Sequence, residues 1–314
     1  MSTQPSLAAD CWFLSGPTAS GKTSVALALA PRIGAEIVSL DSMALYRGME
    51  IGTAKPSLAE RAAVPHHLLD VIDPDEEYSL AQYVAAAHRA VDDIRSRGQS
   101  PLFVGGTPLY LKSLLRGIFE GPPADWELRR GLQELARNEG SQVLHARLAQ
   151  VDPISASRLH PRDTRRIIRA LEVWEKTGQS ITALQQQFDR ARPPDACRVF
   201  VLQWPRAELA ARIDARVDAM FEAGLVDEVR GLLTGGRRFS RTASQAVGYR
   251  EVIEHLQGVR DLADTVALTK LRTRQLAKRQ MTWFRSLCEC RLVAVGGSVD
   301  VASLAARIKA DAEP

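Results

Sequence analysis

Short apolar runs alternate with helical patterns through the first third of the chain. The runs Trp12–Leu14, Glu36–Leu40 and Pro101–Val104 predict buried strands, because each is brief, apolar and followed by small or polar residues. The helices expected between and after them are Lys22–Ala30, Leu80–Arg95 and Leu109–Leu115. Continuous apolar strands that alternate with helices are typical of a parallel sheet covered on both faces.

The pattern becomes entirely helical after Gly121 and stays so until about Arg192. Leu128, Leu132 and Leu135 keep the spacing of one helix face, and Ile167, Ile168, Leu171 and Trp174 do the same later. Proline pairs, at 122–123 and 193–194, flank the stretch and are typical of hinges or boundaries. We therefore expect a helical insertion at 122–196.

Strand-like sequence returns at Arg198–Leu202, and a last strand is expected at Leu292–Val295. Helices are expected from Leu209 to about Gly224, over Gln245–His255 and over Asp261–Cys288. Residues 1–121 and 197–314 then form the two parts of one core. The predicted fold class is an α/β, P-loop NTPase-like parallel sheet with helices on both faces, plus an all-helical insertion domain.

Eight residues between the first strand and the first helix match the pattern G-x-x-x-x-G-K-[ST] in full. Glycines let the backbone wrap an anion, and the helix N-terminus adds partial positive charge. The lysine adds a full charge, and the last threonine is a candidate ligand for Mg²⁺. The predicted diphosphate- or nucleotide-binding residues are Gly16, Pro17, Thr18, Ala19, Ser20, Gly21, Lys22 and Thr23.

Composition adds few constraints. With 45% hydrophobic and 25% charged residues the chain is ordinary for a globular protein, and 41 Lys+Arg against 37 Asp+Glu permit nucleic-acid binding without indicating it. The four cysteines, Cys11, Cys197, Cys288 and Cys290, are too unevenly placed for a disulfide framework or a zinc site. No signal peptide or transmembrane segment is recognisable, so we expect a cytoplasmic enzyme without a membrane partner. The oligomeric state is not readable from the sequence, and a monomer is the default expectation.

Asp41 ends the second strand, where a P-loop ATPase or GTPase usually has a magnesium-binding acid. However, Asp41 is followed by Ser42–Arg47, and no motif for guanine recognition is evident. A base, a helix cap and a magnesium ligand are the roles open to this carboxylate.

Seven segments, in order along nearly the whole chain, resemble the tRNA dimethylallyltransferases, also called isopentenyltransferases. They are Gly16–Thr23, Asp41–Tyr46, Ile51–Pro56, Pro65–His67, Gly105–Tyr110, Gln245–Arg250 and Thr273–Gln280 with Trp283. The resemblance implies that dimethylallyl diphosphate binds in the P-loop with Mg²⁺. Its five-carbon group then passes to N6 of adenosine 37, beside the anticodon of tRNAs that read codons starting with U.

The resemblance implies three catalytic residues. Asp41 contacts the target amine, Thr107 lies at the reacting centre, and Arg216 reaches the diphosphate. The residues themselves leave alternatives open, since Thr107 also fits the N-cap of the next helix. Arg212 and Arg216 share one helix face and also fit a solvated pair with Asp214 or Asp218.

A basic stretch without acids, 270–285, ends in Trp283 and Phe284 and suits an RNA backbone. A second basic cluster, 158–169, lies in the insertion, which by resemblance embraces the anticodon stem-loop. A solvated charged face is the alternative for both. The residues predicted to bind tRNA are Asp41, Ser42, Met43, Ala44, Thr107, Arg129, Arg165, Arg166, Ile167, Ile168, Arg169, Ala246, Val247, Gly248, Tyr249, Arg250, Arg274, Gln275, Lys278, Arg279, Gln280 and Trp283.

Two other functions fit parts of this pattern. A small-molecule or nucleoside kinase shares the P-loop and the sheet but leaves the basic, aromatic helix near the C-terminus without a role. A non-catalytic RNA-binding P-loop protein keeps that helix but gives Asp41 no chemistry.

Overall fold

The computed structural model describes residues 6–9, 11–119, 121–185 and 191–312. They form two compact units: the described residues of Arg116–Arg190 make one, and those of Ser6–Leu115 and Ala191–Pro314 make the other. The first of these units begins at residue 116 and ends at residue 190, whereas the insertion was expected at 122–196. The segment after Ala191 belongs to the second unit because it leads directly into a strand of the sheet.

The second unit is built on a six-stranded sheet with the order β3-β2-β4-β1-β5-β6, and every pair in it is parallel. The strands are β1 (Trp12–Ser15), β2 (Ala35–Ser39), β3 (His66–His67), β4 (Ser100–Gly105), β5 (Arg198–Gln203) and β6 (Arg291–Ala294). Five of them were expected, and the parallel α/β sheet is confirmed. The sixth, β3, is two residues long and lies at the sheet edge, where no strand was expected.

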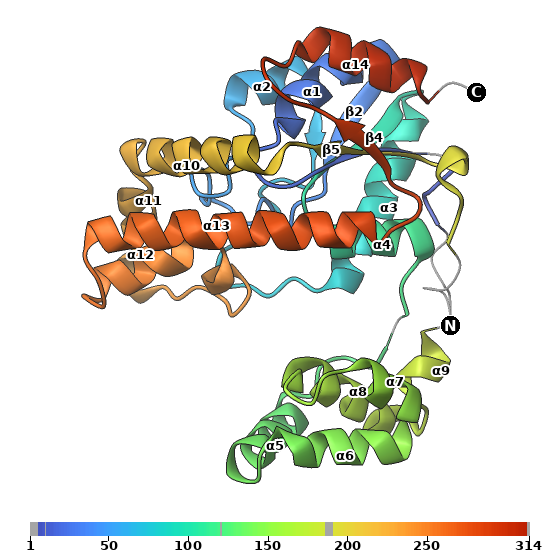
Figure 1. Cartoon of the computed structure of the whole chain (residues 1–314), viewed down its shortest axis with the longest axis vertical. Helices are drawn as coiled ribbons and strands as arrows, with labels where there is room; N and C mark the ends of the chain where they lie inside the picture. Colours follow the sequence, from blue (N-terminus) through green and yellow to red (C-terminus); the bar gives the residue numbers. More distant parts are fainter. Residues whose placement is uncertain (1–5, 10, 120, 186–190, 313–314) are drawn as a thin grey trace. The chain divides into compact units, whose positions relative to one another are not determined.

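Helices cover both faces of this sheet (Figure 1). Their bounds are α1 (Lys22–Leu29), α2 (Leu58–Ala63), α3 (Leu80–Ser96), α4 (Pro108–Arg116), α10 (Arg206–Glu222), α11 (Leu225–Leu232), α12 (Tyr249–Leu256), α13 (Leu262–Arg285) and α14 (Val301–Ala310). On one face Trp12, Leu14 and Phe200 pack with α1 and α14. On the other, Tyr83 of α3 stacks on Tyr110 of α4 and donates a hydrogen bond to the Ser39 carbonyl.

The parallel sheet matters for function because all strands end at the same edge. The P-loop follows β1, Asp41 lies just beyond β2, and Thr107 lies just beyond β4. Strand β4 lies between β1 and β2, and β5 lies on the other side of β1. The residues that carry candidate chemistry are therefore brought together at one edge, where ligands of such sheets bind.

The other unit is all-helical, as expected. Its helices are α5 (Trp126–Asn138), α6 (Ser141–Val151), α7 (Pro153–Arg158), α8 (Thr164–Thr177) and α9 (Ile181–Leu184). Leu132, Leu144, Leu148, Ile167 and Leu171 form its core. In both units, none of the described helices combines the length and apolar character that a membrane span requires.

Candidate active site

The P-loop closes on itself at the start of α1. Gly16 and Gly21 have positive φ, +154° and +83°, which side chains rarely tolerate. A Cβ on Gly16 would also lie 2.9 Å from Ser20 Oγ and 3.1 Å from the Leu202 carbonyl oxygen. Lys22 Nζ donates to the Pro17 carbonyl at 2.8 Å, so the ammonium group lies across the loop where an anion would bind.

Two side chains from the second half of the chain brace this loop. Trp204 Nε1 donates to the Ser20 carbonyl at 3.0 Å, and Arg212 Nε donates to the Ala19 carbonyl at 2.9 Å. The Arg212 guanidinium also lies over the Trp204 ring, 4.2 Å from its centroid. Arg212 is therefore a support of the P-loop and not half of a solvated ion pair. Trp204 was missed, since nothing in its sequence surroundings reveals a partner 184 residues away.

Three charges gather at the mouth of the loop. Burial and the positive charge of Arg216 lower the pKa of Lys22 to about 7, and Asp41 opposes this shift. Burial also lowers the pKa of Arg216, again with Asp41 opposing. The Arg216 Nε atom is buried and has no hydrogen-bond partner among the described residues. Two neighbouring positive charges repel each other, and one of them has a hydrogen-bond donor that no described residue uses. Both features favour the binding of an anion.

The loops after β2 and β4 are joined at Asp41 and Thr107. Asp41 Oδ1 accepts a hydrogen bond from the Met43 amide at 2.8 Å. Thr107 Oγ1 accepts from the Ser42 amide at 3.0 Å, and the Thr107 amide donates to the Leu40 carbonyl at 3.1 Å. The Thr107 hydroxyl thus bonds to the neighbouring loop instead of capping α4. The Asp41 carboxylate is held in place and keeps oxygen lone pairs for a substrate.

Gly105 sets how closely these two loops approach. A Cβ at this position would lie 2.2 Å from the Leu40 carbonyl oxygen, a distance that no side chain allows. The glycine therefore permits the close approach that places Thr107 against Ser42.

Gln280 occupies a different position from the one expected. It was predicted to contact tRNA, but its side chain is buried beside the P-loop. Its Oε1 accepts from the Thr18 amide at 2.9 Å, and its Nε2 donates to the Gly106 carbonyl at 2.6 Å. The prediction was wrong for the side chain because both ends of the carboxamide are used inside the protein.

The basic side chains of α13 fall into two groups. Lys270, Arg272 and Arg274 pair with Asp218, Glu251 and Asp214 at 2.6, 3.2 and 2.6 Å. Lys278 and Arg279 are exposed, and within the described parts of the chain no carboxylate lies at ion-pairing distance from either. Gln275 is exposed as well and Trp283 is half-buried. Only the second half of α13 therefore presents unpaired positive charge.

The segment 246–250 mostly supports the fold. Tyr249 is fully buried, and its hydroxyl donates to Glu228 Oε1 at 2.5 Å. Glu228 Oε2 accepts from the Glu50 and Ile51 amides, and the Tyr249 ring leaves no room for a Cβ on Gly52. The prediction that the Tyr249 side chain binds tRNA was wrong, because it holds the segment 50–52 instead. Ala246 and Gly248 are also buried, Val247 is half-buried, and Arg250 is exposed and pairs with Glu254.

Some candidates near β2 and in the helical unit are also buried. Ala44 is buried, whereas Ser42 and Met43 are half-buried. Ile167 and Ile168 lie in the core of the helical unit, so their side chains do not contact RNA as predicted. Arg165 and Arg166 are exposed.

Glu172 of α8 is completely buried and binds two of the predicted tRNA contacts. Arg129 Nη2 and Arg169 Nη1 lie 2.7 and 2.5 Å from its Oε2 atom. Burial alone would raise the pKa of Glu172, but hydrogen bonds from both arginines outweigh burial and lower it. Arg129 and Arg169 therefore hold the helical unit together. The pairing of Arg129 with Glu172, 43 residues away, could not be predicted from the sequence, whereas Arg169 and Glu172 have the i, i+3 spacing of a helical ion pair.

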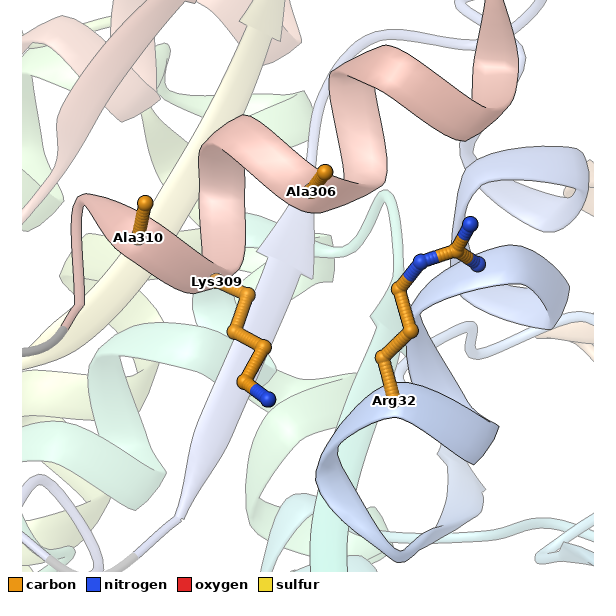
Figure 2. A pocket seen from close by; sticks show the side chains of 4 residues that line it. All are labelled: Arg32, Ala306, Lys309 and Ala310. Atoms are coloured by element: carbon orange, nitrogen blue, oxygen red, sulfur yellow. The ribbon is translucent and has the colours of Figure 1, made fainter.

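A separate depression between η1 (Ala30–Ile33) and α14 is lined by Arg32, Ala306, Lys309 and Ala310 (Figure 2). It lies beyond the carboxyl end of α1, whereas the P-loop lies at the amino end. None of the predicted site residues lines it.

The fold and the site together define a P-loop protein of the kind that binds a diphosphate or triphosphate. A family model described as IPP transferase matches residues 44–287, and one described as isopentenyl transferase matches residues 9–72. The chain belongs to the IPP transferase family.

Individual relatives agree with this membership. The tRNA dimethylallyltransferase of Methylibium petroleiphilum is 51% identical over 291 residues, 91% of this chain and 89% of the relative. That of Geobacter metallireducens is 48% identical over 285 residues, 91% and 92% of the two chains.

Solved structures are similar as well. The full-length tRNA isopentenylpyrophosphate transferase of Bacillus halodurans is 35% identical, with a TM-score of 0.70 and 97% of each chain covered. A eukaryotic dimethylallyltransferase described as acting on tRNA is 28% identical with a TM-score of 0.73. The alignment with it covers 91% of this chain and 73% of the other.

Proposed function

We propose that this enzyme transfers a dimethylallyl group from dimethylallyl diphosphate to N6 of adenosine 37 in tRNA and releases diphosphate. The observation that carries the proposal is the buried Arg216 Nε, which has no hydrogen-bond partner in the described part of the chain and lies with Lys22 at the mouth of the P-loop. Similarity to relatives named tRNA dimethylallyltransferase supplies the substrates.

The first requirement of the reaction is a stabilised leaving group. The bond between the allylic carbon and the diphosphate oxygen breaks, and the electron pair leaves with the oxygen. The P-loop amides, Lys22 and Arg216 would stabilise the negative charge that grows there, and Lys22 is already held across the loop by its bond to the Pro17 carbonyl.

Mg²⁺ fits this site as an ion held by few protein ligands together with the diphosphate. Among the described residues no cluster of three or more His, Cys, Asp or Glu side chains could hold a metal. The Thr23 hydroxyl, beside Lys22, and the oxygens of the diphosphate would hold the ion, since Mg²⁺ commonly binds through few protein ligands plus phosphates and water. When bound, the ion would neutralise part of the leaving-group charge.

The second requirement is acceptance of a proton from the adenine amine. The exocyclic nitrogen forms a bond to the allylic carbon and must lose one proton. The Asp41 carboxylate is half-buried, fixed through the Met43 amide, and close enough to Lys22 and Arg216 to influence the pKa of both. We assign it the base role, with Thr107 and Ser42 fixing the loop beside it.

The third requirement is a surface for tRNA. The exposed Lys278 and Arg279 on α13, and Arg165 and Arg166 on α8, are side chains suited to phosphate contacts. An unpaired base beside the anticodon is also the least costly kind of base to remove from its stack.

Membership of the IPP transferase family favours this function over the kinase alternative. The direct test is mass analysis of tRNA nucleosides after incubation with dimethylallyl diphosphate and Mg²⁺. One adenosine should gain a single five-carbon unit, and γ-labelled ATP should transfer no phosphate to any acceptor. Phosphoryl transfer without prenylation would overturn the proposal.

The assignment of Asp41 has its own test. Asp41→Asn keeps the side-chain shape but removes the basic oxygen, so we expect turnover to fall by about 100-fold or more. Binding of tRNA should stay within about threefold of the original, because the base contributes to chemistry more than to affinity. Undiminished turnover would remove Asp41 from the base role.

A further inference from the structure

Gln280 joins two loops that the reaction needs at a fixed separation. Its Oε1 holds the Thr18 amide in the P-loop, where the leaving group would bind. Its Nε2 holds the Gly106 carbonyl, one residue before Thr107. The bonded residues lie 262 and 174 positions away in the sequence, so the link is entirely tertiary.

The fit around this side chain is close. A Cβ on Gly106 would lie 2.7 Å from the Gln280 Nε2 atom, so the loop backbone passes directly against the carboxamide. A carboxamide also offers an acceptor and a donor on two separate atoms at the same end, with no charge. A glutamate would keep the acceptor for Thr18 but would oppose the Gly106 carbonyl with a negative oxygen.

Gln280 lies on α13 beside the two exposed cations proposed to contact tRNA. Lys278 and Arg279 immediately precede it, and the buried Ala277 belongs to the same hydrophobic cluster as Ala19 of the P-loop and Trp204. One continuous helix therefore carries both the exposed cations and the side chain that holds the P-loop.

We propose that Gln280 is a positioning residue that fixes the P-loop against the loop after β4 and couples tRNA binding on α13 to the grip on the diphosphate. This inference rests on the proposed transfer reaction. It adds that the two substrates bind with positive cooperativity, and that the carboxamide of Gln280 carries the coupling.

The test compares Gln280→Leu and Gln280→Glu in the full chain. Gln280→Leu removes both hydrogen bonds, and we expect kcat to fall about 100-fold while KM for each substrate, measured with the other present, rises about fivefold, the size of the lost coupling. Gln280→Glu keeps the bond to Thr18 and should retain several-fold more activity than Gln280→Leu. The matched control is Gln99→Leu, at an exposed position just before the amino end of β4 and therefore at the opposite end of that strand from Gly106, which should behave as the original protein.

A second measurement separates positioning from simple support of the fold. The probe is the thiolodiphosphate analogue of dimethylallyl diphosphate, which binds without transferring its group, and its affinity is measured with and without tRNA. For the original protein we expect tRNA to raise this affinity by about fivefold or more. For Gln280→Leu the ratio of the analogue affinity with tRNA to the affinity without it should fall to about one.

Two results would overturn the inference. One is an unchanged kcat in Gln280→Leu together with a lower melting temperature, since that is a purely structural role. The other is full retention of the tRNA effect on analogue affinity. Failure of the proposed function itself would look different, because the original protein would then not prenylate tRNA at all.

Discussion

Helices α8 and α13 both carry closely spaced basic residues, and both were expected to bind RNA through them. In α8, Arg169 binds the buried Glu172 and shares it with Arg129 of α5. In α13, Lys270, Arg272 and Arg274 bind acids of α10 and α12, whereas Lys278 and Arg279, nearer the carboxyl end, bind none of the described acids. A run of positive charge therefore has two uses: one part stabilises the fold, and the other is left for a partner.

The difference follows from what each helix packs against. An arginine next to a buried carboxylate lowers the cost of burying that carboxylate, so removing either partner leaves an uncompensated charge. An exposed lysine has no such role, and its charge is available to phosphate. The partner of each cation, and not its position in a basic run, decides which variants damage the fold and which damage binding.

The largest expected effect is on the stability of the helical unit. Glu172→Ala leaves Arg129 and Arg169 facing each other without a carboxylate, and we expect a loss of about 3 kcal/mol in the free energy of unfolding. Urea unfolding followed by circular dichroism measures it. Glu175→Ala, at an exposed site on the same helix, is the control and should change stability by less than about 0.5 kcal/mol. Equal effects of the two variants would contradict the structural role of Glu172.

A smaller effect is expected on tRNA affinity. Replacing Lys278 and Arg279 by alanine should weaken binding and reduce the slope of log K against log salt by about one for each side chain that contacts a phosphate. The melting temperature should not change, because neither side chain has an acidic partner among the described residues. Filter binding at several salt concentrations gives the slope. A lowered melting temperature with an unchanged slope would place these cations in the structural group.

The pH dependence of stability should show the contribution of the Glu172 carboxylate. The folded-state pKa of Glu172 lies below its ordinary value of 4.5, so its contribution is complete above about that pH. The contribution is lost as pH falls through the lowered pKa, because the unfolded chain then binds the proton more readily. Unfolding of the original protein and of Glu172→Gln, compared at about pH 6 and about pH 4, should show a smaller pH effect in the variant. Identical pH dependence would mean that this carboxylate contributes nothing.

The smallest effect is expected for the pair between Arg274 and Asp214. Both side chains are more than one-third exposed, so a double-mutant cycle should give a coupling energy below about 1 kcal/mol. Arg274→Ala should also weaken tRNA binding less than the change at Lys278 and Arg279 does. A loss of affinity as large as theirs would show that Arg274 leaves Asp214 to bind RNA.

The sequence predicted the residues that local pattern defines. The P-loop motif, the acid after β2 and the threonine after β4 could be located because each follows an apolar strand. Tyr249, Gln280 and Arg129 were assigned to RNA because each lies in or near a basic or family-like segment. Their true partners are Glu228, Thr18 and Glu172, which only the tertiary structure brings near.

Helical spacing could show which face of a helix is apolar, and it placed Ile167 and Ile168 inward. It could not show that a polar residue such as Gln280 also points inward, since a buried polar group is justified only by its partners. The two-residue strand β3 was missed for a related reason, because so short a run has no measurable period.

The bond between Gln280 and Thr18 also has a consequence for how the protein is made. Synthesis proceeds from the amino end, so the Gly16–Thr23 cradle leaves the ribosome long before Trp204, Arg212 and Gln280 exist to brace it. A growing chain therefore carries a complete motif but an unfinished anion site until α13 has emerged and docked.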